Sequence, residues 1–246
     1  PAATQARRAD SETILYQPPI RAIVEISMEW KHPTGKAPKS VVLVCLGASH
    51  QDYISDAINR EPPDWMLNAD EIWTLNRGAL AFRHDLAFVM DYLDGEAAHY
   101  PRYATMLRRS LSPIITSIAG QQWPKHISEY PIKEIWNWLM SEIKPHHQEW
   151  LINSVPLILV YAAFIGVKTM HIYGADYQGH SQAEDGAACL SYWIGVMEHR
   201  LAVKVPVTTQ LLGANNRFIY GYPPDLDPRP DAVARRRLFQ ELIAHA

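Results

Sequence analysis

The chain has 246 residues, of which 48% are hydrophobic and 20% are charged. This length and balance are typical of one globular domain with additions, and they argue against two equal domains. The formal net charge of -3 excludes a general attraction to nucleic acid or to an anionic membrane, although it is compatible with a local basic groove. The apolar stretch Val155–Ile165 is shorter than the roughly 18 residues of a membrane span, so we expect no membrane partner.

Cysteine usage and the start of the chain indicate the cellular compartment. Cys45 and Cys189 are the only cysteines, and both lie in apolar segments, which predicts buried thiols in a reducing environment. The printed chain opens without a basic and apolar leader. We therefore expect a cytoplasmic protein.

Strand-like and helix-like segments alternate along the chain. Residues 1–39 are interpreted as an N-terminal extension, which includes an alternating strand over 21–30. Short β-branched or apolar runs predict strands at 40–46, 71–75, 86–90, 113–116, 169–173 and 204–207. Helices are predicted at 51–59, 100–110, 154–165, 184–201 and 231–244.

This alternation predicts an α/β fold, Rossmann-like, with a mostly parallel sheet and helices on both faces. We expect a single catalytic domain over residues 40–210, with the N-terminal extension before it and a C-terminal tail and helix over 211–246. The stretch 123–150 is rich in Trp and His, and helical spacing over 132–143 makes it a helical insert or lid. The segments 41–46, 71–75, 86–90 and 169–173 should be neighbours in one sheet.

The stretch 153–177 is the most informative part of the chain. Ser154 is a candidate cap for an apolar helix, and Gly166 suits the left-handed position just past its end. The apolar run 169–173 then has the length of a central strand. It is followed by a turn that holds an acid and an aromatic residue: Gly174, Ala175, Asp176 and Tyr177.

Ligands of open α/β sheets bind in the crevice outside the carboxyl ends of the strands, so this turn is expected at a nucleotide site. Asp176 has no helix of its own to cap, and we interpret it as a surface-like turn residue that hydrogen-bonds a ribose or an acceptor hydroxyl. The alternative is an ordinary turn aspartate.

The first strand runs into Gly47, Ala48 and Ser49. Small residues let the backbone approach a phosphate, and the helix that follows is expected to offer free N–H groups. The turn matches neither the dinucleotide fingerprint nor a P-loop, so a tight turn without a ligand stays open as the alternative. Polar residues at other strand ends add to the candidate site, although each alone is more often a cap or turn former: Asn76, Arg77, Asp91 and Ser117.

These motifs resemble the Rossmann-like bacterial sialyltransferases of glycosyltransferase family 42, and the related domain that includes 6-hydroxymethylpterin pyrophosphokinase-like proteins. In the sialyltransferases a Gly-Asn-Gly-Pro-Ser-Leu turn follows the first strand. Gly47-Ala48-Ser49 takes that place here, without the asparagine and the second glycine. Leu75-Asn76 is similar to their Cys-Asn, Asn153-Ser154 to their Thr-Ser-Gly, and Gly174-Ala175-Asp176-Tyr177 to their Gly-Ile-Asp-Phe-Tyr.

The resemblance implies a glycosyltransferase that uses a nucleotide-sugar donor as co-substrate, with no other cofactor, and an acceptor alcohol. The segment 174–201 is also similar to undescribed proteins of bacteriophages, which implies a phage enzyme acting in the host cytoplasm on a hydroxymethylated pyrimidine base in DNA. Two alternatives stay open. One is a pyrophosphokinase-like transferase on a pterin or similar alcohol, which needs Mg²⁺ and a second carboxylate, such as Asp91, near Asp176. The other is a non-enzymatic nucleotide-binding module.

Transfer to a hydroxyl needs a base near the acceptor oxygen. His180 follows Tyr177 on a glycine-containing loop and is the candidate catalytic base beside Asp176, with a surface loop histidine as the alternative. Glu184 contacts the ligand or closes a capping box that begins at Ser181.

Other clusters carry weaker signals. No Asp-x-Asp follows a strand, and the adjacent residues 146 and 147 are histidines that would face different sides of a helix, so we predict no metal site. The tryptophans at 136, 138 and 150 are core residues or a stacking platform. Arg102, Arg108 and Arg109 give the helix at 100–110 a basic face, which binds diphosphate or a nucleic-acid backbone, or is simply solvated. The sequence does not define the oligomeric state.

Overall fold

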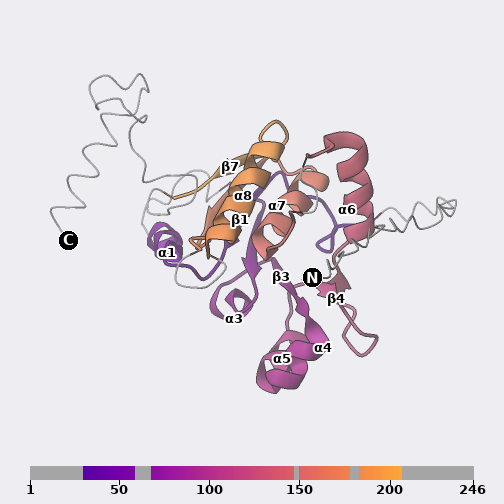
Figure 1. The fold of residues 1–246 in the computed structure, drawn as a ribbon. Helices are drawn as coiled ribbons and strands as arrows, with labels where there is room; N and C mark the ends of the chain where they lie inside the picture. The colour runs from indigo at the N-terminus through magenta and orange to yellow at the C-terminus, as the bar shows by residue number, and fades with distance from the viewer. Residues whose placement is uncertain (1–29, 59–67, 147–149, 178–182, 207–246) are drawn as a thin grey trace, which may run out of the picture.

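The computed structural model describes residues 30–58, 68–146, 150–177 and 183–206. Its centre is a seven-stranded sheet in the order β5-β4-β3-β2-β1-β6-β7, in which every pair of neighbours is parallel (Figure 1). The strands are β1 (Ser40–Val44), β2 (Glu71–Leu75), β3 (Leu86–Tyr92), β4 (Ile114–Ile118), β5 (Ile127–Glu129), β6 (Thr169–Tyr173) and β7 (Ala202–Lys204). The predicted parallel sheet is confirmed, and the four strands expected to be neighbours lie side by side as β3-β2-β1-β6.

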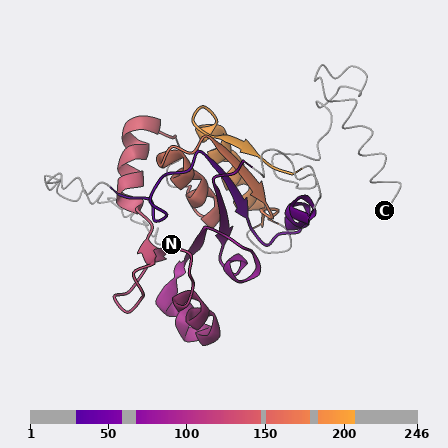
Figure 2. The same cartoon turned by 180° about the vertical axis from the view of Figure 1, so that it is seen from behind.

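Helices cover both faces of the sheet, as expected. They are α1 (His50–Ile58), α3 (Gly78–Ala81), α4 (Leu93–His99), α5 (Pro101–Arg108), α6 (Ile132–Trp138) with its π-helical continuation η1 (Leu139–Ile143), α7 (Ser154–Phe164) and α8 (Ala183–Met197). Figures 1 and 2 show α7 and α8 side by side on one face, seen from the front and from behind.

Side chains of successive strand residues pack on opposite faces of the sheet, and this explains why the sheet has one apolar layer on each face. Val41 and Leu43 of β1 point into the main core with α7 and α8, while Val42 and Val44 pack on the other face with residues of α1. Successive side chains of a strand point to opposite faces, so a strand buried on both faces must be apolar throughout. Helix α7 is apolar all round because it lies in the middle of the core, where Ile158 is completely buried.

The stretch 123–150 belongs to the fold rather than lying over it, as far as its residues are described. Strand β5 extends the sheet beside β4, and α6 packs against α7. Ile135 and Leu139 are completely buried in the main core, and the ring of Trp138 meets that of Phe164 at 5.7 Å. The core interpretation of Trp138 is therefore confirmed, whereas Trp136 is 39% exposed.

Local predictions at the ends of elements meet different outcomes. Gly166 adopts φ +89 just past α7, as expected. The cap of α7 is Asn153, whose side chain accepts from the Val155 N–H, so the prediction of Ser154 as the cap is wrong by one residue. Strand β7 begins and ends earlier than the predicted 204–207, since its pairing with β6 extends from Ala202 to Lys204.

The structure also bears on the expectations about the cysteines and about membrane spans, and it leaves those at the two ends of the chain undescribed. Cys45 and Cys189 are free, buried thiols, as predicted. No helix among the described segments has the length and apolar character needed to cross a bilayer. The expected helix at 231–244 and nearly all of the expected strand at 21–30 lie outside the described residues, and the predicted domain bounds stay predictions.

Candidate functional site

The candidate site lies where the order of the strands reverses. From β1 the chain continues to β2, β3, β4 and β5 on one side, and β6 and β7 lie on the other. Connections therefore leave the carboxyl ends of β1 and β6 in opposite directions, and this is the place at which open α/β sheets bind their ligands. The turn after β1 and the turn after β6 meet at this point.

Three hydrogen bonds join the two turns. The backbone N–H of Gly47 donates to the carbonyl oxygen of Gly174 at 2.8 Å. The N–H of Gly174 donates to the hydroxyl oxygen of Ser49 at 2.9 Å, and the N–H of Ser49 donates to Oδ2 of Asp176 at 2.6 Å. Four of the predicted site residues, far apart in sequence, thus form one interlocked unit.

The approach of the two turns is close enough to require glycine. A Cβ on Gly47 would lie 2.5 Å from the Gly174 carbonyl oxygen and 2.8 Å from Oδ2 of Asp176. At Gly174, where φ is +70, a Cβ would lie 2.4 Å from the carbonyl oxygen of Cys45. Side chains at these positions would push the turns apart, so the contact between the two turns requires glycine.

Asp176 is buried, which corrects the expectation of a surface-like turn residue. Only 6% of it is exposed, and its Oδ2 caps the Ser49 N–H at the start of the turn into α1. Oδ1 is buried and has no hydrogen-bond partner among the described residues. A buried carboxylate oxygen without a donor is costly, so this atom is free to accept from a bound hydroxyl or N–H.

The N–H groups expected to bind a phosphate are already used. His50, Gln51 and Asp52 donate to the carbonyl oxygens of Gly47, Ala48 and Ser49 at 3.0, 3.2 and 3.2 Å. The chain tightens into i to i−3 bonds as α1 begins, and this satisfies donors that a helix start normally leaves free. The prediction that this helix offers free N–H groups to a phosphate is therefore wrong.

A second contact group borders the turn after β6. The Tyr177 hydroxyl donates to Oδ1 of Asn153 at 2.8 Å, and this same oxygen accepts from the Val155 N–H. A Cβ on Gly186 of α8 would lie 2.5 Å from the Tyr177 ring, so the ring packs closely against the helix at this glycine. Burial raises the pKa of Tyr177 far above its ordinary value, and the hydroxyl stays protonated.

The remaining predicted residues lie farther along the same edge. Asn76 follows directly after β2 with φ 51, and its Oδ1 is buried without a partner in the described part of the chain. Arg77 extends to the ring of Tyr100, 4.8 Å from its centroid. Asp91 lies on β3 and Ser117 on β4, so they are two and three strands from β1. Because neighbouring strands are about 4.8 Å apart, the three spacings from β3 to β6 place Asp91 on the order of 14 Å from β6.

Two expectations about the loop after Tyr177 stay predictions. His180 and Ser181 lie outside the described residues, so neither a catalytic role nor the capping box is tested. Glu184 is exposed in the first turn of α8, and Ser154 is the first residue of α7. Across the described segments, no group of three or more His, Cys, Asp or Glu side chains is arranged to hold a metal ion.

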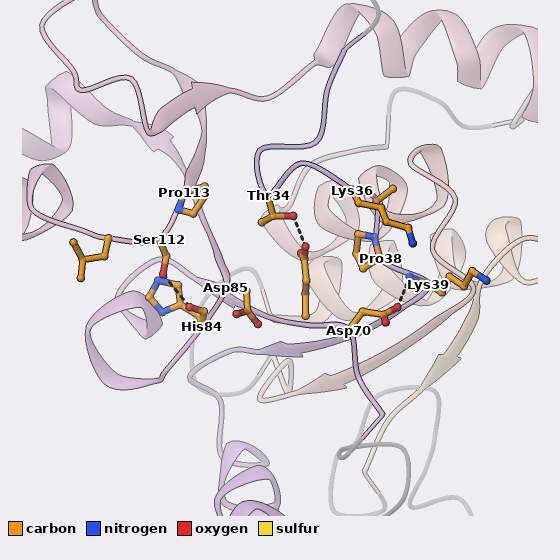
Figure 3. Close-up of a pocket in the computed structure, with 12 residues that line it drawn as sticks. Thr34, Lys36, Pro38, Lys39, Asp70, His84, Asp85, Ser112 and Pro113 are labelled. Carbon is orange, nitrogen blue, oxygen red and sulfur yellow. Dashed lines mark hydrogen bonds between the residues drawn. The ribbon is translucent and has the colours of Figure 1, made fainter.

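A pocket of about 720 Å³ that sequence reasoning missed lies at the opposite, amino edge of the sheet (Figure 3). Its carboxylates have partners: Asp70 accepts from the N–H of Lys39 at 2.6 Å, and Asp85 accepts from the N–H of Ile72 at 2.8 Å. The third carboxylate, Glu71, accepts from the hydroxyl of Thr34. These three carboxylates therefore hold the segments that precede the strands in place by hydrogen bonds.

Comparison with known proteins gives few matches. No family model matches this chain, and no curated protein matches it. An α-2,3-sialyltransferase from Campylobacter jejuni in apo form matches with a TM-score of 0.44 and 13% identity, over 72% of this chain and 78% of its own. The sialyltransferase CstII from Campylobacter jejuni, in complex with the substrate analogue cytidine-5'-monophosphate, matches with a TM-score of 0.44 and 15% identity, over 81% of this chain and 99% of its own. These matches describe a likeness in the course of the backbone and carry no conclusion about the reaction.

Proposed function

We propose that this chain is a glycosyltransferase that takes a sugar from a nucleotide donor and transfers it to an acceptor hydroxyl without a metal ion. The observation that carries the proposal is the buried Asp176 at the strand reversal, with Oδ2 bonded to Ser49 and Oδ1 free of partners among the described residues. A nucleotide ribose in that crevice would supply the missing donor through its hydroxyl groups. The resemblance of the turns after β1 and β6 to those of sialyltransferases supports the choice of reaction.

The proposed reaction divides into steps that side chains can serve. A base removes the proton of the acceptor hydroxyl, its oxygen bonds to the anomeric carbon, and the bond from that carbon to the donor phosphate breaks, releasing the nucleotide. His180, three residues beyond Tyr177, is the proposed base. Asp176 is proposed to orient the donor through a hydrogen bond, a role that its rigid attachment to Ser49 favours.

A hydroxymethylated pyrimidine in DNA, as a phage enzyme would modify, belongs among the acceptors to test. The pyrophosphokinase alternative is less favoured by one specific observation. The pyrophosphokinase needs a second carboxylate near Asp176, and Asp91 is the candidate. Asp91 lies on β3, which is three strands away from β6, the strand that Asp176 follows.

A transfer assay tests the proposal. Purified protein is incubated with a panel of nucleotide sugars and with simple alcohols, glycans or hydroxymethylated oligonucleotides, and products are identified by mass spectrometry, with and without EDTA. We expect the mass of one sugar to be added to an acceptor and the yield to be unchanged by EDTA. Transfer of diphosphate from ATP to a pterin alcohol, dependent on Mg²⁺, would contradict the proposal and favour the alternative.

A further inference from the structure

A second pocket, of about 710 Å³, lies at the carboxyl edge of the sheet beside Arg77. It is formed by the turn after β2 and by the first residues of α5. Figure 1 shows α3 and the α4–α5 pair at the same end of the sheet. Its volume falls within the range of small-molecule sites. The residues that line it are Arg77, Leu80, His99, Tyr100, Pro101, Arg102, Tyr103 and Met106.

The pocket combines positive charge with apolar surface. Arg77 and Arg102 contribute guanidinium groups, and none of the described residues that line the pocket is acidic. Leu80, Tyr100 and Met106 are each more than two-fifths exposed, which is unusual for large apolar side chains gathered in one place. An anion joined to a planar or apolar group fits this combination.

The guanidinium donors are available. The guanidinium carbon of Arg77 lies over the Tyr100 ring, 4.8 Å from the ring centroid. A guanidinium carries five N–H donors. The guanidinium groups of Arg77 and Arg102 make no hydrogen bond or ion pair with any residue that the structure describes. Both can therefore bind phosphate oxygens in the paired geometry that arginine favours.

Tyr103 adds an unused donor. The residue is only 8% exposed, and its buried hydroxyl has no partner in the described part of the chain. Burial, followed by the carboxylates of Asp91 and Glu96, raises the pKa of this tyrosine far above its ordinary value, so the hydroxyl keeps its proton. Tyr103 also lies in the first turn of α5, where backbone N–H groups lack helical partners and the helix dipole attracts anions.

We propose that the pocket of Arg77, Arg102, Tyr100 and Tyr103 binds a nucleotide unit, with its phosphate on the two guanidinium groups and its base against Tyr100, Leu80 and Met106. This site is separate from the crevice at Asp176 and does not depend on the transferase reaction. The nucleotide is either free or part of a single DNA strand, since both present a base and a phosphate.

Calorimetric titrations test this inference. The probes are dCMP, deoxycytidine, inorganic phosphate and a ten-residue single strand of deoxycytidine. We expect dCMP to bind at least tenfold more tightly than deoxycytidine or phosphate alone, because both halves of the pocket contribute. Arg102→Ala should weaken dCMP binding by about tenfold, as expected for the loss of a charged hydrogen-bond donor, and Tyr103→Phe should weaken it less.

Matched variants separate the outcomes. Arg109→Ala removes an exposed arginine from the other end of the same helix and should leave dCMP binding unchanged. A strand that binds tighter than dCMP identifies a DNA source for the nucleotide, and equal or weaker binding identifies a free nucleotide; both support the pocket. Wild-type affinity in both Arg77→Ala and Arg102→Ala overturns it. Loss of dCMP binding in Asp176→Asn alone also overturns it, and then the nucleotide belongs to the crevice of the proposed transferase.

Discussion

The backbone N–H of Ser49 lies 2.6 Å from Oδ2 of Asp176, although the two residues are 127 positions apart in the chain. Ser49 belongs to the turn after β1 and Asp176 to the turn after β6, so this bond closes the point at which the strand order reverses. The bond uses one carboxylate oxygen and leaves the other buried without a described partner. Asp176 is thus held in one orientation before any ligand arrives.

The tight approach of the two turns predicts a steep cost for Gly174→Ala. The added Cβ would lie 2.4 Å from the carbonyl oxygen of Cys45, and φ at this residue is +70. Because that oxygen belongs to the backbone, it cannot move aside as the end of a flexible side chain could. We expect a loss of roughly 2–4 kcal/mol in the free energy of unfolding, measured with urea. Gly195→Ala is the control: it meets nothing within 4 Å in α8 and should stabilise the protein by about 0.5–1 kcal/mol. Equal stability of the two variants would contradict the geometry.

The bond between Tyr177 and Asn153 should appear as coupling between their variants. Tyr177→Phe removes the hydroxyl that donates to Oδ1 of Asn153, and Asn153→Ala removes both that acceptor and the cap of α7. We expect about 0.5–1.5 kcal/mol for the first and about 1–2 kcal/mol for the second. The double variant should lose less than the sum of the two. Strict additivity in urea unfolding would mean that the two side chains do not interact.

Acid should weaken the attachment of the segment that precedes β1. Burial alone would raise the pKa of Glu71, but hydrogen bonds from His32, Thr34 and Trp73 outweigh it and hold the pKa below its ordinary value of 4.5. A lowered pKa in the folded state gives stability that is complete above pH 4.5 and is lost as the pH falls through the lower value. Glu71→Gln should show a smaller loss of stability over that acidic range. An identical pH profile for the two proteins would refute this role.

His180→Ala should lower kcat and kcat/KM together, because a base that acts only in the transition state does not hold the donor. The expected loss is about 10²–10⁴-fold, the usual worth of general base catalysis. Donor affinity, measured separately by calorimetry, should stay unchanged. Turnover at the wild-type rate would place the base elsewhere, and Glu184 in the first turn of α8 would become the better candidate.

The sheet could be predicted from sequence because its central strands are buried on both faces. A run such as Val41–Val44 is apolar throughout, and few other structures accommodate that pattern in a chain of alternating elements. Strand β5 could not be predicted, because three residues, Ile127–Glu129, carry no periodicity. The helical spacing of apolar residues over 132–143 was visible in the sequence. The packing of this segment on α7 depends on tertiary contacts, which no local pattern encodes.

The candidate site was predictable only in part, for a related reason. That Ser49 and Asp176 follow two strands is visible in the sequence, and their contact follows once those strands are adjacent. The use of the N–H groups after Gly47 depends on how the turn tightens, which the residue types leave undetermined. The pocket at Arg77 needs the α4–α5 pair to lie beside the turn after β2, so Tyr100 and Tyr103 gave no signal as ligand contacts.

The choice of variant at Asp176 follows from its two oxygens. Asp176→Ala would leave the Ser49 N–H unpaired and cost about 1–3 kcal/mol of stability, which would confuse folding with binding. Asp176→Asn keeps one oxygen that accepts from the Ser49 N–H, and it replaces the unpartnered carboxylate oxygen by an NH2 group, which donates instead of accepting. Asp70→Asn makes the same change at the opposite edge of the sheet, where the carboxylate accepts from the N–H of Lys39, and serves as the control.

Calorimetric binding of a nucleotide sugar to these proteins tests the central claim most directly. The ligand is the nucleotide sugar that raises the melting temperature of the wild-type protein most in a panel, since a ligand of the native state stabilises it. We predict that Asp176→Asn weakens its binding at least tenfold while Asp70→Asn binds like the wild type. Equal affinity in all three proteins, or no binding of any nucleotide sugar to the wild type, would contradict the assignment of the crevice as a donor site.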